Sequence, residues 1–309
     1  YQAGLPKGAL QLLPGRRDVI GKPLLQDPRV QGVILTGSTA TGKMMARTLA
    51  ERPGLIVPLI AETGGQNAMI VDSTALPEQV VQDVVDSAFK SAGQRCSAMR
   101  ILFVQEDIAD KIITMLKGAM ATLSIGDPAA LQIDIGPVID QKALNALHNH
   151  QKYLKTHGAQ KIAQCQMPEG LNGFYFAPVA YELSSIDILE EEVFGPILHI
   201  VRFNGKDMHG IIDQINQTGY GLTLGIHSRI ERTVKAIAQR ARVGNIYVNR
   251  NMIGAVVGVQ PFGGEGLSGT GPKAGGPWYL TRLCREQTIS TNTTAVGGNA
   301  SLMRMTDDA

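Results

Sequence analysis

Short apolar runs alternate with longer amphipathic runs along most of the chain. Apolar runs bounded by turn residues, typical of buried strands, cover residues 33–36, 56–60, 68–71, 101–104, 198–203, 224–227 and 245–248. Runs with apolar positions at helical spacing cover residues 39–51, 77–91, 108–122, 141–157, 208–217 and 231–241. Repeated strand–helix alternation predicts parallel sheet covered by helices, so the expected fold class is α/β.

Composition narrows the class of protein. With 309 residues the chain can form two domains or one large one. The formal net charge is +2 with scattered basic residues, which argues against nucleic-acid and membrane-surface binding. No run is apolar and long enough to span a bilayer. Cys96, Cys165 and Cys284 cannot form a disulfide framework and have no zinc-ligand spacing, so we expect no metal and a reducing, cytoplasmic compartment.

The segment Gly37–Lys43 has the spacing of a phosphate-binding P-loop. The next residue is Met44, whose thioether is a poor ligand for Mg²⁺. The segment still joins an apolar strand to a helix N-terminus, where free N–H groups and the helix dipole attract anionic phosphate. From these residues alone, an ordinary strand–turn–helix and a phosphate site without metal both remain open.

Two residues have the side chains needed for acyl chemistry. Cys96 follows a helix and small residues in FKSAGQRCSAMR, a setting that can expose a sulfur beside backbone N–H groups. Glu62 follows an apolar run and precedes Gly64-Gly65, where a carboxylate can act as a general base. Taken singly, a buried packing cysteine and a surface glutamate are the commoner alternatives.

Two later stretches suggest ligand contacts. In ILEEEVFGP, residues 188–196, a carboxylate can bind ribose hydroxyls and an aromatic ring can pack on a planar group, although charge runs are usually solvated. The glycine-rich segment 249–271 allows close backbone approach, and its N–H groups can hold a carboxylate. The alternative is a long structural crossover loop.

Five motifs in fixed order resemble the aldehyde dehydrogenase superfamily: GSTATG, ETGGQN, GQRCSA, EEVFGP and QPFGGEGLSGTG. Within it, Thr63, Gln66, Ser97 and the segment NMIGAVVGVQPFGG are similar to the L-glutamate γ-semialdehyde (1-pyrroline-5-carboxylate) dehydrogenases. The ending EQTISTNTTAVGGNASLM resembles the bifunctional proline utilization A proteins of bacteria.

The resemblance implies NAD-dependent oxidation of L-glutamate γ-semialdehyde to L-glutamate, the second step of proline catabolism. Cys96 corresponds to the nucleophile that forms a thioester, and Glu62 to the base that activates water. Contacts to the substrate's α-carboxylate and aliphatic chain are implied for Ser97, Gly254, Ala255 and Phe262. Contacts to NAD are implied for Gly37, Ser38, Glu192 and Phe194: the pyrophosphate for the first two, the ribose for Glu192 and the nicotinamide side for Phe194.

The resemblance also implies a domain plan. Residues 1–63 correspond to the C-terminal part of an NAD-binding domain, 64–265 to the catalytic domain, and 266–309 to a return segment with an oligomerisation strand at 288–294. We expect a homo-oligomer, with a FAD-dependent proline dehydrogenase module in the full-length protein. The family's oxyanion Asn and its adenine-ribose Lys have no counterpart before Val33, so we expect the chain as printed to be inactive or weakly active.

Two other functions compete with this one. A phosphate-using semialdehyde reductase has the same thiol chemistry and does not need Glu62 to activate water. A non-catalytic piece acting only in assembly needs neither Cys96 nor Glu62 and agrees with a strand-like tail.

Overall fold

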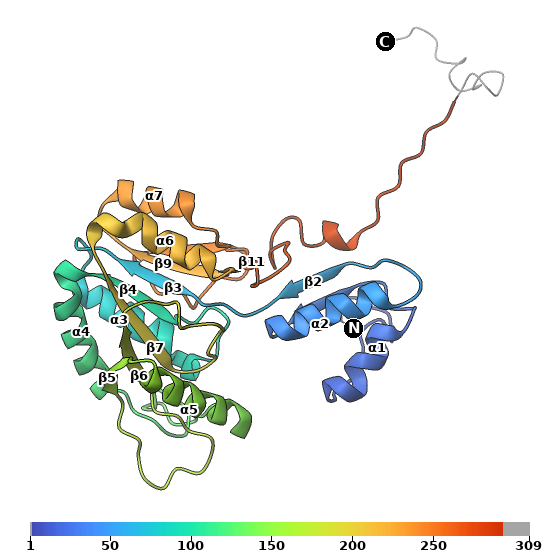
Figure 1. The fold of residues 1–309 in the computed structure, drawn as a ribbon. Helices are drawn as coiled ribbons and strands as arrows, with labels where there is room; N and C mark the ends of the chain where they lie inside the picture. The colour runs from blue at the N-terminus through green and yellow to red at the C-terminus, as the bar shows by residue number, and fades with distance from the viewer. Residues whose placement is uncertain (1, 293–309) are drawn as a thin grey trace.

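The computed structural model describes residues 2–292 and shows two lobes joined by a narrow neck (Figure 1). The larger lobe contains a seven-stranded sheet in the order β10-β9-β3-β4-β7-β6-β5, parallel except for the antiparallel β5–β6 pair. Its strands are β3 (Ala68–Val71), β4 (Ile101–Gln105), β5 (Gln160–Gln164), β6 (Val179–Leu183), β7 (Ile197–Phe203), β9 (Thr223–His227) and β10 (Asn245–Val248). The expected α/β class is confirmed.

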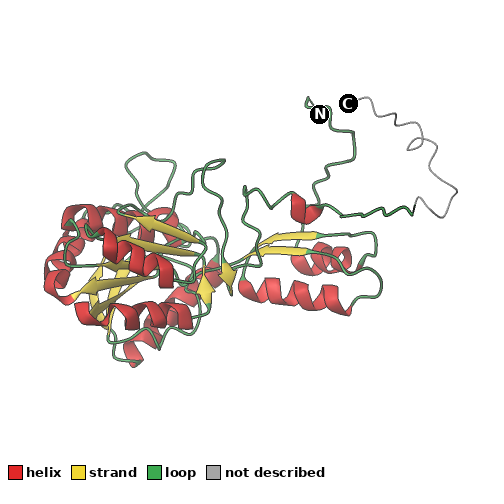
Figure 2. Ribbon diagram, turned by 90° about the horizontal axis from the view of Figure 1, so that it is seen from above, coloured by secondary structure: helices red, strands yellow, loops and turns green. Residues whose placement is uncertain are grey.

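The order of the strands explains why helices cover both faces of this sheet (Figure 2). From β3 the chain moves through β4 to β5 at one edge, returns through β6 to β7, and then passes β3 to reach β9 and β10. Right-handed crossovers place helices on opposite faces when the direction reverses. The helices are α3 (Pro77–Phe89), α4 (Glu106–Ala121), α5 (Gln141–Thr156), α6 (Met208–Gln217) and α7 (Glu231–Arg240), with short turns η2 (Lys90–Gly93) and η3 (Gly205–Asp207).

The smaller lobe is built on two parallel strands, β1 (Val33–Thr36) and β2 (Leu59–Glu62). Its helices are η1 (Arg17–Gly21), α1 (Lys22–Gln26) and α2 (Thr39–Glu51). Residues 266–271 return from the large lobe and run beside β2, where Thr63 N–H donates to Ser268 O at 2.9 Å and Thr270 N–H to Ala61 O at 2.9 Å. The remaining short elements are β8 (Tyr220–Gly221), β11 (Glu265–Gly266) and η4 (Thr281–Leu283).

Several boundaries differ from the sequence prediction for identifiable reasons. The strand expected at 56–60 is β2 at Leu59–Glu62, because Val33 pairs with Leu59 and Pro58 has no N–H to donate. The helix expected at 77–91 ends at Phe89, since Ser91 and Ala92 adopt positive φ angles. The sequence pattern does not predict β5, β6 or α1, because each is only five residues long and β5 is largely exposed.

The structure describes part of the tail segment 288–294, which is expected to form an oligomerisation strand. Residues 288–292 form no strand in this single chain, whereas 293 and 294 lie outside the described residues. The described part of the tail extends away from both lobes (Figure 1). Oligomerisation through a tail strand therefore stays a prediction, as do the domain boundaries at 63 and 265.

We expect Ile70→Ala to lower the free energy of unfolding by about 2–5 kcal/mol, because Ile70 is fully buried in β3 and its loss leaves a cavity. Ile56→Ala is the matched control, since Ile56 is fully exposed, and it should change stability by less than about 0.5 kcal/mol. Denaturant unfolding measures both values. Equal effects of the two substitutions would contradict this placement of the core.

Candidate active site

The predicted site residues lie at one edge of the large sheet. Residues before β3, β4 and β7 carry Glu62, Cys96 and Glu192, and the amino ends of these parallel strands share one edge. This edge faces the neck, so residues of the small lobe and of the return segment also reach it (Figures 1 and 2). The site therefore forms where the two lobes meet.

A tight reversal after α3 presents Cys96. Ser91, Ala92 and Gly93 have φ angles of 56°, 52° and 64°, a left-handed conformation that is unusual for the first two. An ideal Cβ on Gly93 would lie 2.4 Å from Gly195 O, so this position excludes any side chain. The reversal stops the helix and turns the chain into the cysteine loop.

Asn67 fixes the cysteine loop to the sheet. Its buried side-chain NH₂ donates to Cys96 O at 2.6 Å and to Ala98 O at 2.9 Å. Its Oδ1 accepts the N–H of Thr223 at 3.2 Å. These bonds link the nucleophile loop to the start of β9 and hold its backbone in one position.

Arg100 joins the cysteine loop to the EVFGP segment. Its guanidinium is 2% exposed and donates to Gly93 O at 2.7 Å and to Gly195 O at 3.1 Å. It also pairs with Glu192 Oε1 at 3.4 Å and lies 5.2 Å from the Phe194 ring centroid. Glu192 and Phe194 are thereby placed beside the nucleophile loop.

The Cys96 thiol is half-buried and feels the charges of two carboxylates. Burial raises its pKa most, the negative charges of Glu192 and Glu62 raise it further, and a hydrogen bond from Ser97 N–H opposes them. The charge effects show that Cys96, Glu62 and Glu192 share one site. The thiol form is favoured at neutral pH, and the Ser97 N–H beside the sulfur can stabilise an oxyanion.

Glu62 ends β2 and points into the same site. Its Oε2 accepts the N–H of Gly264 at 3.1 Å, while Oε1 is buried with no hydrogen-bond partner. Burial raises the pKa of Glu62 to about 7, against the lowering effects of the Gly264 N–H and of Lys273. A carboxyl group with this pKa can both take and return a proton near neutral pH.

The turn at Gly37–Ser38 lies directly beside Glu62. Thr36 pairs with Glu62 in the β1–β2 ladder, and Gly37 N–H donates to Glu62 O at 3.1 Å. Ser38 caps α2, its Oγ accepting the N–H of Thr41 at 3.2 Å. The positive end of the 13-residue helix α2 is thus exposed next to the general-base candidate, where an anionic group would be favoured.

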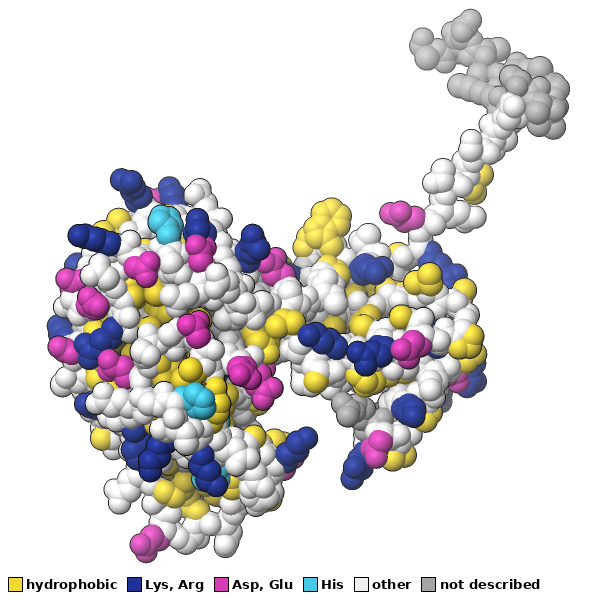
Figure 3. All heavy atoms as spheres, in the orientation of Figure 1, with side chains coloured by type: hydrophobic (Ala, Val, Ile, Leu, Met, Phe, Trp, Pro, Cys, Tyr) yellow, Lys and Arg dark blue, Asp and Glu magenta, His cyan; other side chains and the backbone are white. Residues whose placement is uncertain are grey.

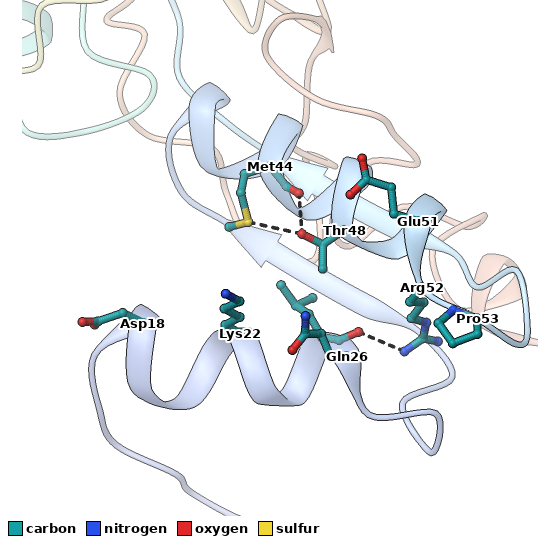
Figure 4. A pocket seen from close by; sticks show the side chains of 9 residues that line it. Asp18, Lys22, Gln26, Met44, Thr48, Glu51, Arg52 and Pro53 are labelled. Carbon is teal, nitrogen blue, oxygen red and sulfur yellow. Dashed lines mark hydrogen bonds between the residues drawn. The ribbon is translucent and has the colours of Figure 1, made fainter.

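A crevice between α1 and α2 continues from this helix (Figure 4). Leu25 and Met44 give it apolar walls, and Lys22, Thr48 and Glu51 give it a polar rim. The buried Arg52 side chain closes one end by donating to backbone oxygens of the α1–β1 connection. The sequence pattern does not reveal this crevice, because α1 is too short to show a helical pattern.

The glycine-rich loop after β10 lies against the cysteine loop. Arg95 Nη1 donates to Ile253 O at 3.1 Å, and Arg250 Nη2 donates to Gly254 O at 2.9 Å. Gly254 is exposed and Ala255 half-buried, so their backbone is accessible on a loop that contacts Arg95, the residue before Cys96. Ser97, the third residue predicted to hold the substrate's carboxylate, is instead buried, with only 6% of its surface exposed.

Phe262 is half-buried and lies on the return side of the site. It exchanges two backbone hydrogen bonds with Ala274, and the residues after it, Gly263 and Gly264, contact the Glu62 carboxylate. The structure thus brings Cys96, Glu62 and Glu192 within range of one another's charges, and hydrogen bonds join Gly37 and Gly264 to Glu62. It adds Asn67, Arg100 and Lys273, which sequence patterns do not distinguish from ordinary polar residues.

Comparison with known proteins agrees with this geometry. The profile of the aldehyde dehydrogenase family matches residues 1–289. The bifunctional protein PutA of Escherichia coli (strain K12) is 53% identical over 290 residues, which is 91% of this chain and 22% of that protein. A 1-pyrroline-5-carboxylate dehydrogenase of Geobacillus kaustophilus is 35% identical over 296 residues, 94% of this chain and 56% of that protein.

Solved structures show the same likeness. A crystal structure of bifunctional proline utilization A superposes with a TM-score of 0.90 at 56% identity, covering 95% of this chain and 30% of that one. A 1-pyrroline-5-carboxylate dehydrogenase from Thermus with bound NAD superposes with a TM-score of 0.84 at 33% identity, covering 91% of this chain and 55% of that one. The chain thus spans about a fifth of its PutA relatives and about half of the shorter dehydrogenases. By this match and by its fold, the chain belongs to the aldehyde dehydrogenase family.

Proposed function

We propose that this chain carries the site for NAD-dependent oxidation of L-glutamate γ-semialdehyde, derived from 1-pyrroline-5-carboxylate, to L-glutamate. The observation that carries this proposal is the common site of the Cys96 thiol and the Glu62 carboxyl, whose pKa burial raises to about 7. The names of the relatives, PutA and 1-pyrroline-5-carboxylate dehydrogenase, support the choice of substrate.

In the first half of the reaction the Cys96 sulfur adds to the aldehyde carbon. Because burial favours the thiol form, the proton must leave as the bond forms, and Glu62 is the group suited to take it. The Ser97 N–H next to the sulfur is placed to stabilise the developing alkoxide. Bound NAD⁺ would supply the hydride acceptor, and loss of hydride from the substrate carbon would leave a thioester on Cys96.

In the second half Glu62 activates water, after it has released the thiol proton to solvent. Its carboxylate then takes a proton from a water molecule, the hydroxide adds to the thioester carbon, and Cys96 leaves as the thiolate, which regains a proton. The buried Oε1, which has no hydrogen-bond partner among residues 2–292, is free to accept that proton. A phosphate-using semialdehyde reductase would not need this oxygen, because it transfers the acyl group to phosphate rather than to water.

The chain's residues fit a dinucleotide. The exposed start of α2 at Gly37–Ser38 would hold the pyrophosphate, and the crevice between α1 and α2 would hold the adenine. Glu192 and Phe194 would contact the nicotinamide half, since Arg100 places both beside Cys96. The Glu192 carboxylate pairs with Arg100 in this structure, so ribose binding would compete with that pair.

The backbone at Gly254 and Ala255 would hold the substrate's α-carboxylate, with Phe262 along its aliphatic chain. The accessible loop beside Cys96 supports this role, although the burial of Ser97 limits its side chain to a minor contribution. In a longer protein of the PutA type, a FAD-dependent proline dehydrogenase module would supply the substrate in the cytoplasm.

Assembly as a homo-oligomer is also proposed. Exposed Trp278, Leu280 and Ile289 on the return segment favour it, because such residues usually meet a partner surface. Figure 3 shows further hydrophobic side chains over the small lobe. Within residues 2–292 every helix is too short or too polar to cross a membrane.

Replacing Glu62 by Gln should trap the enzyme as a thioester. In the native protein supplied with semialdehyde and NAD⁺, E62Q should give one burst of NADH and then turn over about 10²–10⁴-fold more slowly. Mass spectrometry should find the glutamyl adduct on the Cys96 peptide.

Cys96→Ala should abolish both the burst and the adduct, whereas Cys284→Ala, at an exposed thiol of the return segment, should behave like the wild type. Normal turnover of E62Q with added phosphate would favour the reductase alternative. An alkylating aldehyde mimic that labels Cys96 no faster than Cys284 would favour a non-catalytic role.

Ala255→Asp should discriminate between aldehydes with and without a carboxylate. A negative charge at the proposed anchor should raise KM for the semialdehyde at least tenfold and leave propanal little changed, because only the first substrate carries a carboxylate. Val257→Asp, on the same loop at a fully exposed position, is the charge-matched control. Equal effects of Ala255→Asp on both aldehydes would contradict the anchor.

A further inference from the structure

Lys273 lies behind the general-base candidate, on the return segment. The backbone pairing of Phe262 with Ala274 places Lys273 opposite Gly263. An ideal Cβ on Gly263 would lie 2.5 Å from Glu62 Oε1 and 3.1 Å from the Cα of Lys273. Gly263 is therefore a thin spacer between the Glu62 carboxylate and the Lys273 backbone.

The Lys273 side chain is half-buried and points into the start of β10. Its Nζ donates to Gly244 O and, at 3.4 Å, to Asn245 Oδ1. Asn245 Oδ1 also accepts the N–H of Gly263 at 3.3 Å, and its NH₂ donates to Pro261 O at 3.0 Å. Two acceptors around Nζ favour the ammonium form, and the same contacts hold the loop that touches Glu62.

We propose that Lys273 is a positioning residue for Glu62: its ammonium group anchors the 261–264 loop against the carboxylate and supplies a positive charge across Gly263. This inference rests on the proposed function for its role in turnover. Because Glu62 Oε1 has no hydrogen-bond partner, the charge acts through space and leaves that oxygen free for water.

The charge acts in a direction that favours catalysis. Lys273 lowers the pKa of Glu62 against the larger effect of burial. Burial lowers the pKa of Lys273, and the charge of Glu62 opposes that shift. The other titratable group that interacts with Glu62 within residues 2–292 is the Cys96 thiol, which itself interacts with Glu192. Without Lys273, Glu62 would stay protonated to higher pH and could not accept a proton from water at neutral pH.

The test measures the proton affinity of Glu62 without catalysis. Its pKa in the folded protein exceeds its ordinary value of 4.5. Between pH 4.5 and about 7, Glu62 is ionised in the unfolded chain but still protonated in the folded protein, so rising pH lowers the stability of the wild type. E62Q lacks this group and should gain stability relative to the wild type up to about pH 7. In the K273Q background the gain of E62Q should extend to a pH about half to one unit higher, because loss of the positive charge raises the pKa of Glu62.

K273Q removes the charge but retains a donor for Gly244 O. K273R retains the charge, so the gain of E62Q should end at the same pH as in the wild-type background. A second readout is the pH profile of aryl-ester hydrolysis by Cys96, whose deacylation midpoint should move upward in K273Q and not in K273R. This readout remains available if K273Q is too unstable for unfolding curves.

The outcomes separate the two proposals. If K273Q lowers stability or hydrolysis equally at every pH, Lys273 only supports the loop and the inference is overturned. If the interval moves but E62Q hydrolyses esters normally, Lys273 tunes Glu62 as inferred and the proposed function fails. If E62Q blocks hydrolysis while K273Q moves neither readout, the proposed function stands without Lys273.

Discussion

The buried guanidinium of Arg100 is the interaction on which the site depends. It comes immediately before β4 and connects segments almost a hundred residues apart, because its donors reach Gly93 and Gly195 carbonyls and the Glu192 carboxylate. A cation this buried is tolerated only when its donors are paired, so its partners must stay in place. The nucleophile loop and the proposed cofactor-side residues therefore move as one unit.

Partial burial gives the site its chemistry. Burial raises the pKa of the thiol and of both nearby carboxyls, and it brings the pKa of Glu62 to about 7. The thiol stays protonated until a base is available, and Glu62 has the right proton affinity to be that base. Small differences between neighbours, such as the Gly264 N–H and Lys273 on Glu62, then decide which group holds the proton.

The sequence predicted the elements well where a pattern was long or strongly apolar. The helices at 39–51 and 208–217 and the strands at 33–36, 68–71 and 245–248 have the predicted bounds. It failed at 56–60, where pairing with β1 rather than apolarity sets the strand, and at β5 and β6, which are five residues long and of which β5 is largely exposed.

For the site, single residues were ambiguous, and the order of five motifs resolved them. Cys96 and Glu62 each have a commoner structural explanation, and a local pattern cannot show that they share a site. Asn67, Arg100 and Lys273 were out of reach for a different reason. Their roles come from carbonyl oxygens contributed by distant loops, and a carbonyl leaves no signature in the sequence.

The two lobes contribute opposite helix ends, which explains why the site needs both. The large lobe places its residues at the amino ends of parallel strands, where its own helices end, and α3 runs directly into the cysteine loop. The negative end of a helix disfavours a thiolate, so this lobe alone cannot activate Cys96 or attract phosphate. The small lobe adds the positive end of α2 at Ser38 and, in the last pair of the β1–β2 ladder, the proposed base Glu62. Anion binding and proton transfer thus enter from one lobe, and the nucleophile from the other.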